Sequence, residues 1–455
     1  MNPSTLPSIP SLQPGAGPER PAAEVPLSSA RGRFARLPQL AGRGFLPLGL
    51  FARLPLAMLT VGTLTLVTSV SGSYAVGGTA AGAVGVGSAI GAPVLGAMAD
   101  RRGQRPVLLT AAALNTIAVL GLIAAAYAMA PHGSFPAALL AAAFVSGATC
   151  PQVGPLARVR WMALTSHGSL RSGPANRTAA NTQDLDTALS YESTADELTF
   201  VLGPALVGIL ASLVAPWLPL ALAAALTITL VPAFAVHRTG RAVPIHRGAA
   251  AGAARAHESG PKAPDVAARG IPLAVALPVL AMVCMGTFFG STQTALSSFA
   301  AGFASSEVAG LLYAVMGVSS AVAALSVAYW PPRFTASARW LLGAVLMAAL
   351  TFLLFVPSSA AGMVLVLLVL GIPVGPVMVT VFAIGGVIAP VGRLGTVMTA
   401  LASGIVAGTA VGSAVAGHIA QLHGHSGAFL VPAAAAVSLV LLGAASAVVL
   451  RRKRT

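Results

Sequence analysis

The sequence predicts an all-α membrane protein whose twelve transmembrane helices form two pseudo-symmetric six-helix bundles. Three observations predict this fold class. Hydrophobic residues make up 56% of the 455 residues and charged residues only 8%, whereas a soluble domain carries about 25% charged residues. Long apolar runs recur along the chain, and the basic residues lie in alternate connecting segments. The bilayer therefore has to act as the solvent for most of the chain.

Each expected span is an apolar run near the roughly 20 residues that a helix needs to cross the hydrocarbon core. Alternation of inner and outer connections then allows the count to be tested against charge. The expected spans are 54–75, 78–99, 106–129, 135–157, 194–214, 217–236, 272–296, 308–330, 340–356, 360–387, 394–420 and 427–450.

The positive charges support this topology. With the N-terminus inside, all 26 Lys and Arg residues fall in cytoplasmic segments, including Arg53, Arg158 and Arg160. Cytoplasmic loops carry such an excess because cations resist translocation. The net charge of +15 thus reflects topology rather than nucleic-acid binding. An even number of spans also places both termini in the cytoplasm.

Composition divides the chain into five regions. Residues 1–53 are rich in Pro, Ser and Arg, lack the apolar run of a signal peptide, and are expected to form a disordered cytoplasmic tail. Residues 54–236 form the first bundle and 272–450 the second. The Gly-, Ala- and Pro-rich segment 237–271 is expected to be a flexible cytoplasmic linker, and 451–455 a basic cytoplasmic tail.

The connection after the second span carries the most specific motif. It reads GAMADRRGQR from Gly96 to Arg105 and resembles the G-x-x-x-D-R-x-G-x-R signature of the major facilitator superfamily. The resemblance implies that superfamily's two-bundle fold and a gating role for the motif residues Gly96, Asp100, Arg101, Gly103 and Arg105. The matching connection of the second half, from Trp330 to Arg339, lacks the Asp and the Gly.

The residue types of this motif suit a clamp. Gly103 can supply a turn with positive φ. Asp100 can accept charge-assisted hydrogen bonds from arginines or face a helix N-terminus. Such contacts would hold the two halves together on the cytoplasmic side and would break when that side opens. The alternative is a solvated turn.

Acidic residues near the fifth span suggest proton coupling. The stretch from Tyr191 to Pro204 resembles the E-S-x-x-D-E-x-x-F-x-x-G-P segment of permeases from high-GC Gram-positive bacteria, which implies a bacterial plasma (inner) membrane. Carboxylates within a membrane are costly and often carry protons. The alternative is a helix-capping box with Arg158 or Arg160 as a partner. The proton-coupling candidates are Glu192, Asp196 and Glu197.

The Gly203-Pro204 pair resembles part of the fifth-helix motif of exporters in the same superfamily. The resemblance also implies a central cavity lined from spans one, four, seven and ten. No charged group is expected to face it, which favours a neutral or lipophilic substrate. The cavity candidates are Thr63, Gln152, Phe289 and Gln293.

Glycines at near four-residue spacing recur in the second and eleventh spans. Such stripes are expected to form a smooth seam between the two halves, or else to serve generic close packing. They comprise Gly78, Gly82, Gly87 and Gly91 in the second span, and Gly404, Gly408 and Gly412 in the eleventh.

These features predict a secondary active transporter that works by alternating access, most specifically proton-coupled efflux. Uptake of a small solute such as a sugar is the alternative, and a non-transporting membrane receptor or enzyme is the alternative of another class. The chain lacks a G-x-x-x-x-G-K-[ST] phosphate loop, so a proton gradient is the expected energy source. We expect no catalytic residue, cofactor or metal site. The expected partners are a small-molecule substrate and the lipid bilayer, with no nucleic acid, for a monomer.

Overall fold

The computed structural model describes residues 32–128, 137–167, 174–245, 273–300, 306–331 and 333–452. Within these residues, twelve helical segments are long and apolar enough to cross a membrane. The first half consists of η1 (Arg33–Arg36), α1 (Leu37–Ala41), α2 (Phe45–Phe51), α3 (Leu54–Ser71), α4 (Tyr74–Arg102), α5 (Gln104–Tyr127), α6 (Ala137–Ala148), α7 (Val153–His167), α8 (Pro174–Leu213), α9 (Leu218–Val236) and η2 (Arg238–Ala242).

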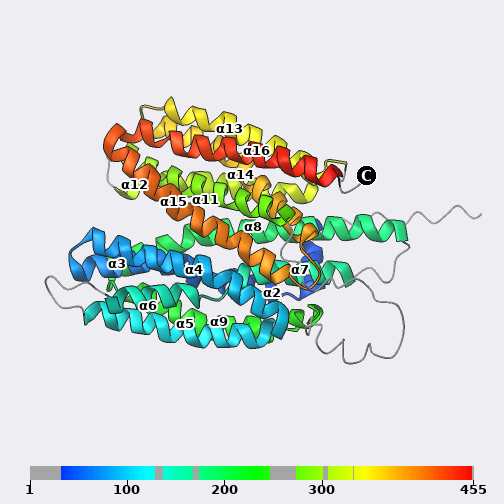
Figure 1. The fold of residues 1–455 in the computed structure, drawn as a ribbon, viewed down its shortest axis with the longest axis horizontal. Coiled ribbons are helices and arrows are strands. Elements are labelled where there is room, and N and C mark those ends of the chain that lie inside the picture. The colour runs from blue at the N-terminus through cyan, green and yellow to red at the C-terminus, as the bar shows by residue number, and fades with distance from the viewer. Residues whose placement is uncertain are drawn as a thin grey trace, which may run out of the picture.

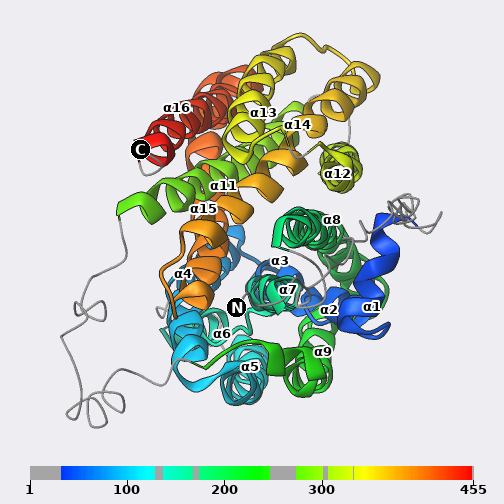
Figure 2. The same cartoon turned by 90° about the vertical axis from the view of Figure 1, so that its right-hand side faces the viewer.

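The second half has the same number of spans. It consists of α11 (Leu273–Ala300), α12 (Ser306–Ser326), η5 (Val327–Tyr329), α13 (Ala336–Thr351), η6 (Phe352–Phe355), α14 (Ala360–Ile388), α15 (Leu394–Ala428) and α16 (Leu430–Arg452). The two halves lie side by side with their helices running in a common direction (Figure 1). They meet where α15 lies against α4 and where α12 lies against α8 (Figure 2). The predicted fold class is confirmed.

Every expected span has one counterpart among the twelve, but the first and the fifth begin well before the predicted residue. The first span runs from Phe45 rather than residue 54, because α2 and α3 follow each other almost without interruption. The fifth runs from Thr182 rather than residue 194, inside a helix that begins at Pro174. Both extensions contain charged residues. The hydropathy pattern predicts loops for these residues, but the structure places them within the spans.

The prediction that residues 1–53 form a disordered tail is wrong for residues 33–53. Leu37, Ala41 and Phe45 are at most 1% exposed and belong to an apolar cluster of the first half. Their spacing of four residues places apolar side chains on one side of the chain, which gives this short segment a face to bury. The flexible-linker prediction is also wrong for residues 238–242, which form η2 and bury Thr239. Residues 1–31, 246–272 and 453–455 lie outside the described part of the chain, so the rest of the linker and of the basic tail remain predictions.

Five of the seven stripe glycines pack closest against a helix of their own half, and a Cβ atom at Gly78 or Gly82 would meet nothing within 4 Å, so the predicted seam between the halves is wrong. A Cβ atom at Gly87 or Gly91 would lie 2.1 or 2.0 Å from backbone carbonyl oxygens of α6. A Cβ atom at Gly408 would lie 2.0 Å from the Val283 carbonyl oxygen of α11. These glycines therefore let α4 approach α6, and α15 approach α11, at backbone distance.

Candidate functional site

Asp100 joins the two halves at one end of the molecule. It lies near the C-terminus of α4, and its carboxylate accepts hydrogen bonds from the backbone N–H groups of Gly395 and Thr396, each at 2.7 Å. The Thr396 hydroxyl donates a third bond, also at 2.7 Å. These residues open α15, so a negative charge sits at a helix N-terminus, where the backbone dipole and unpaired N–H groups favour it. The sequence predicts either arginines or a helix N-terminus as the partner of Asp100, and the structure shows the helix N-terminus.

The remaining motif residues shape this contact. Gly103 has φ of +87° and separates α4 from α5, as predicted. Gly96 faces α15, where a Cβ atom would lie 2.0 Å from the Thr399 hydroxyl oxygen and 2.7 Å from the Gly395 carbonyl oxygen. Arg101 and Arg105 are exposed. The glycines therefore bring the two helices close enough for Asp100 to reach α15.

A second ionic contact joins the halves at the same end. Arg339, near the start of α13, donates a hydrogen bond of 2.9 Å to Asp186 of α8. Arg339 lies in the connection that lost the Asp and Gly of the motif, so the second half contributes a cation here in place of an acid. Arg33, in η1, also donates to the Ala328 carbonyl oxygen of the second half. The ends of α4 and α15 that meet here are those predicted to be cytoplasmic. The contacts of Asp100, Arg339 and Arg33 join the two halves at this end.

A small cavity lies between the halves, farther along α4 and α15 from these contacts. It encloses about 50 Å³, which is room for a few water molecules at most. A solute can therefore enter only if the two halves separate. Residues of α3, α4, α7, α8, α14 and α15 line it, including Arg53, Gln152, Arg158, Asp196 and Phe382.

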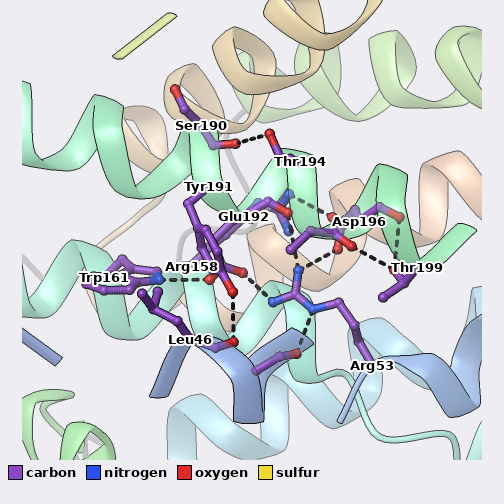
Figure 3. Close-up of polar contacts among 12 residues, drawn as sticks. Leu46, Arg53, Arg158, Trp161, Ser190, Tyr191, Glu192, Thr194, Asp196 and Thr199 are labelled. Atoms are coloured by element: carbon purple, nitrogen blue, oxygen red, sulfur yellow. Dashed lines mark hydrogen bonds and ion pairs between the residues drawn. The ribbon is translucent and has the colours of Figure 1, made fainter. Parts of the chain in front are cut away.

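Two arginines and two acids form a buried ionic cluster beside this cavity (Figure 3). Arg53 bridges the two acids: its Nη2 lies 2.5 Å from Glu192 Oε2, and its Nη1 lies 2.8 Å from Asp196 Oδ1. Arg158 Nη2 holds the other Asp196 oxygen at 2.8 Å. The indole N–H of Trp161 donates to Glu192 Oε1 at 2.8 Å. Every carboxylate oxygen of the cluster thus accepts at least one hydrogen bond.

Glu197 has a different environment. Successive helix residues are about 100° apart, so Glu197 turns away from the cluster toward α12. It is 7% exposed and accepts a 2.7 Å hydrogen bond from the Ser320 hydroxyl of α12. Thr194, one turn earlier, donates to the Ala321 carbonyl oxygen at 3.1 Å. None of the ion pairs among the described residues includes Glu197. It is a buried carboxylate on the boundary between the halves.

The structure separates the two hypotheses for the acidic residues. The capping box is wrong, because α8 begins at Pro174, well before Ser193. A basic partner is confirmed for Asp196, which Arg158 binds. Arg160 instead binds Gln104, the Phe234 carbonyl oxygen and Thr239.

Arg53 is the residue that the sequence reasoning missed. It was counted as a loop cation, yet it is only 4% exposed. Its position between the short apolar segment 45–51 and the apolar run from Leu54 was the available signal, because a cation flanked by two apolar helical runs has to find an internal partner.

The cavity predictions have a mixed outcome. Gln152 lines the cavity, whereas Thr63 donates to the Leu59 carbonyl oxygen within α3. Phe289 packs against the apolar core of the second half, and Gln293 is exposed. The premise that no charged group faces the cavity is wrong, since Arg53, Arg158 and Asp196 all line it.

Gly203 and Pro204 lie within α8. A Cβ atom at Gly203 would lie 2.7 Å from the Ala57 Cβ of α3, so this glycine serves close packing inside the first half. Pro204 continues the helix without interrupting it. The structure thus gives the Gly-Pro pair a packing contact but leaves its link to export a prediction.

Solved structures with a similar fold are transporters. The human organic anion transporter MFSD10 (TETRAN) aligns with a TM-score of 0.65 at 18% identity, covering 91% of this chain and 100% of that one. A bacterial homologue of the iron transporter ferroportin aligns at 0.61 and 13% identity, covering 89% and 98%. The proton:xylose symporter XylE aligns at 0.60 and 14% identity, covering 87% and 94%.

No curated protein sequence matches this chain. The family model described as Major Facilitator Superfamily matches residues 45–403, which include the Asp100 contact, the ionic cluster and Glu197. The match begins at Phe45, where the structure places the start of the first span. The chain is therefore a membrane transporter of the Major Facilitator Superfamily.

Proposed function

We propose that this chain is a proton-coupled secondary transporter that exports a small organic solute by alternating access, with Glu197 as the proton carrier. One observation carries the proposal: among the described acids inside the spans, Glu197 is buried at the boundary between the halves without a cation. An unpaired ionised carboxylate in an apolar site costs several kcal/mol, roughly, and protonation removes that cost. Burial without a cation therefore favours proton binding at Glu197.

The other two candidates have a different chemistry. Glu192 and Asp196 are each held by at least one guanidinium at hydrogen-bond distance. Loss of either negative charge would leave a buried arginine without its ionic partner. The contrast singles out Glu197 as the group that gains and loses a proton, and it leaves Glu192 and Asp196 as fixed parts of the first half.

The position of Glu197 connects protonation to movement. Its hydrogen bond to Ser320 crosses from α8 to α12, so the bond is lost when the halves separate there. Protonated Glu197 can leave Ser320 at little cost, whereas an ionised carboxylate has to find water or another donor. Protonation therefore changes the relative free energy of the two conformations, which is what coupling requires.

The test uses vesicles and a substrate taken from an export and sensitivity screen of cells with and without the gene. In inverted vesicles, an acidic interior should drive accumulation of the exported solute. Glu197→Gln should abolish proton-driven accumulation while retaining solute counterflow, because the binding cavity remains. Asp184→Asn, at an acid paired with the exposed Arg36, is the matched control and should behave as the wild type.

Two outcomes would reject the proposal. Proton-driven accumulation by Glu197→Gln at the wild-type level would remove Glu197 from coupling. Accumulation only in right-side-out vesicles would establish uptake in place of export. The export direction itself follows from the resemblance of Gly203-Pro204 to exporters, so the vesicle orientation tests that resemblance directly.

A further inference from the structure

We propose that the central cavity binds the carboxylate of a small organic acid through Arg158, with the apolar walls holding the rest of the molecule. This inference rests on the proposed transport of a small organic solute and names its chemical class. The cavity lies between the two halves and is lined from both of them. Its contents decide what an alternating-access protein can carry, because a solute must contact both halves on its way through.

Arg158 has hydrogen-bonding capacity that the protein does not use. The residue is 0% exposed and lines the cavity. Its Nη2 binds Asp196, but Nε and Nη1 have no hydrogen-bond partner among the described residues. These two nitrogens carry three N–H bonds, and buried donors on a cation are costly to leave unpaired. An acceptor brought by a ligand would remove that cost.

A glycine and a ring of the second half lie next to the Arg158 guanidinium. Gly154 lies over the cluster, where a Cβ atom would be 3.2 Å from Asp196 Oδ1 and 3.7 Å from Arg158 Nη1. Phe382 of the second half covers the guanidinium, with its ring centre 3.9 Å from Cζ. Separation of the halves removes Phe382 from Arg158, so the cation becomes accessible when the cavity widens.

The remaining lining selects among anions. Ser403 contributes a buried hydroxyl oxygen without a hydrogen-bond partner among the described residues. Most other lining side chains are apolar, including Leu56, Phe200, Ile405 and Val406. One unpaired cation, one hydroxyl and apolar walls match a monocarboxylate with a hydrocarbon body. An organic cation lacks a comparable site, because both oxygens of Asp196 are already held by guanidinium groups.

The first experiment measures binding to the full-length chain in lipid nanodiscs without a proton gradient. The probes are octanoate, benzoate and phenylbutyrate, each compared with its primary amide, which has the same shape without the charge. Calorimetric titration should show each carboxylate binding about ten-fold or more tightly than its amide, the ratio expected for one additional charge-assisted hydrogen bond.

Variants of the ion pair give effects of opposite sign. Asp196→Asn should tighten carboxylate binding by about ten-fold, because it frees N–H groups of both Arg53 and Arg158. Arg158→Gln should remove the preference for the carboxylate over the amide. The double variant Arg158→Gln/Asp196→Asn leaves no unpaired charge at this pair and should also lack the preference. A purely structural role of the pair would move both single variants in the same direction.

Matched controls and outcomes make the test decisive. Asp184→Asn and Arg241→Gln repeat the two chemical changes at residues outside the cavity and should leave binding unchanged. Equal affinity for carboxylate and amide in the wild type, or an unchanged preference in Arg158→Gln, would overturn the inference. Proton-driven transport of an amide would overturn it while preserving the proposed coupling. Carboxylate binding with proton-independent flux would support the carboxylate site and reject the proposed proton coupling.

Discussion

The two halves share a helix arrangement but differ in what they bury. The first half buries Arg53, Arg158, Arg160, Glu192 and Glu197, all at most 7% exposed. In the described part of the second half, the only buried charged residue is Arg339, which lies near the start of α13. The second half is otherwise built around an apolar core of Leu, Val, Met and Phe side chains.

This difference assigns separate tasks to the halves. Buried ion pairs hold their partners in one geometry, because separating them leaves uncompensated charge. The first half therefore provides a fixed charged wall for the cavity. The second half faces this wall and Glu197 with uncharged side chains, the Phe382 ring and the Ser320 hydroxyl. Specific chemistry lies in one half, and the surface that moves away from it lies in the other.

Loss of Arg53 is expected to have the largest effect. Arg53→Met would leave Glu192 without its arginine and Asp196 with only one, which should destabilise the first half by about 3–5 kcal/mol. Thermal unfolding monitored by size-exclusion chromatography in detergent measures this change. Arg101→Met, at an exposed arginine, is the control and should change stability by less than about 0.5 kcal/mol.

The double variant Arg53→Met/Glu192→Gln tests the cause. It removes one positive and one negative charge and leaves the pair between Arg158 and Asp196 intact. Most of the lost stability should return, because no charge of the ionic cluster is then unpaired. If Arg53→Met were as stable as Arg101→Met, the first half would not depend on its ionic cluster, and the contrast between the halves would fail.

Asp100→Ala is expected to have the next largest effect, on conformation rather than on stability. It removes three hydrogen bonds and the charge at the start of α15. A loss of about 2–3 kcal/mol would shift the equilibrium between closed and open cytoplasmic sides by about 30- to 150-fold. The rate of thiol labelling at Ala402→Cys, a cavity position, reports this shift from the cytoplasmic side.

The labelling experiment needs a background in which Cys150 and Cys284 are replaced by alanine. Asp184→Ala should label at the parent rate, and Asp100→Asn should fall between parent and Asp100→Ala because the amide oxygen still accepts hydrogen bonds. Equal labelling of Asp100→Ala and its parent would mean that the contact with α15 does not hold the halves together.

Disruption of the pair between Asp186 and Arg339 is expected to have a smaller effect. The two side chains are 18% and 8% exposed, so solvent weakens the attraction relative to the deeply buried cluster. A double-mutant cycle with Asp186→Ala and Arg339→Ala should give a coupling energy of about 0.5–1.5 kcal/mol in the labelling assay. A coupling near zero would show that the first-half motif alone closes this end.

The fold was predictable because the constraint on it is local. Each span has to be apolar over about 20 residues, and the connections have to keep cations on one side, so hydropathy and charge identify the helices without pairwise information. The charge pattern does not place Arg53 inside the first span, because the acids that pair with it are distant in sequence. Glu192 is 139 residues away and Asp196 is 143 residues away. A buried cation looks like a loop cation until its partner is known.

The candidate site was predictable only in part for the same reason. The motif placed Asp100 at the gate, and burial in a membrane singled out the acids of α8. The sequence could not distinguish Asp196, which two arginines hold, from its neighbour Glu197, which meets Ser320. A rotation of about 100° between adjacent helix residues decides that difference, and only the packing of α8 between the halves fixes its direction.

Alanine at Gly82, in one of the glycine stripes, is expected to have the smallest effect. Nothing lies within 4 Å of a Cβ atom built at Gly82, whereas the same atom at Gly408 would lie 2.0 Å from the Val283 carbonyl oxygen. Gly82→Ala should therefore leave transport unchanged and stabilise α4 by about 0.5 kcal/mol through helix propensity. Gly408→Ala should cost about 1–3 kcal/mol, because it forces α15 away from α11.

Thermal unfolding and counterflow, measured on both variants, also test whether the halves slide along these stripes. A seam between the halves would make alanine at Gly82 slow transport, since the added methyl group would obstruct the movement of α4 past the second half. A glycine that serves only close packing within one half predicts the opposite ranking, with stability lost at Gly408 and transport kept at Gly82. Slow transport in Gly82→Ala with normal stability would restore the seam.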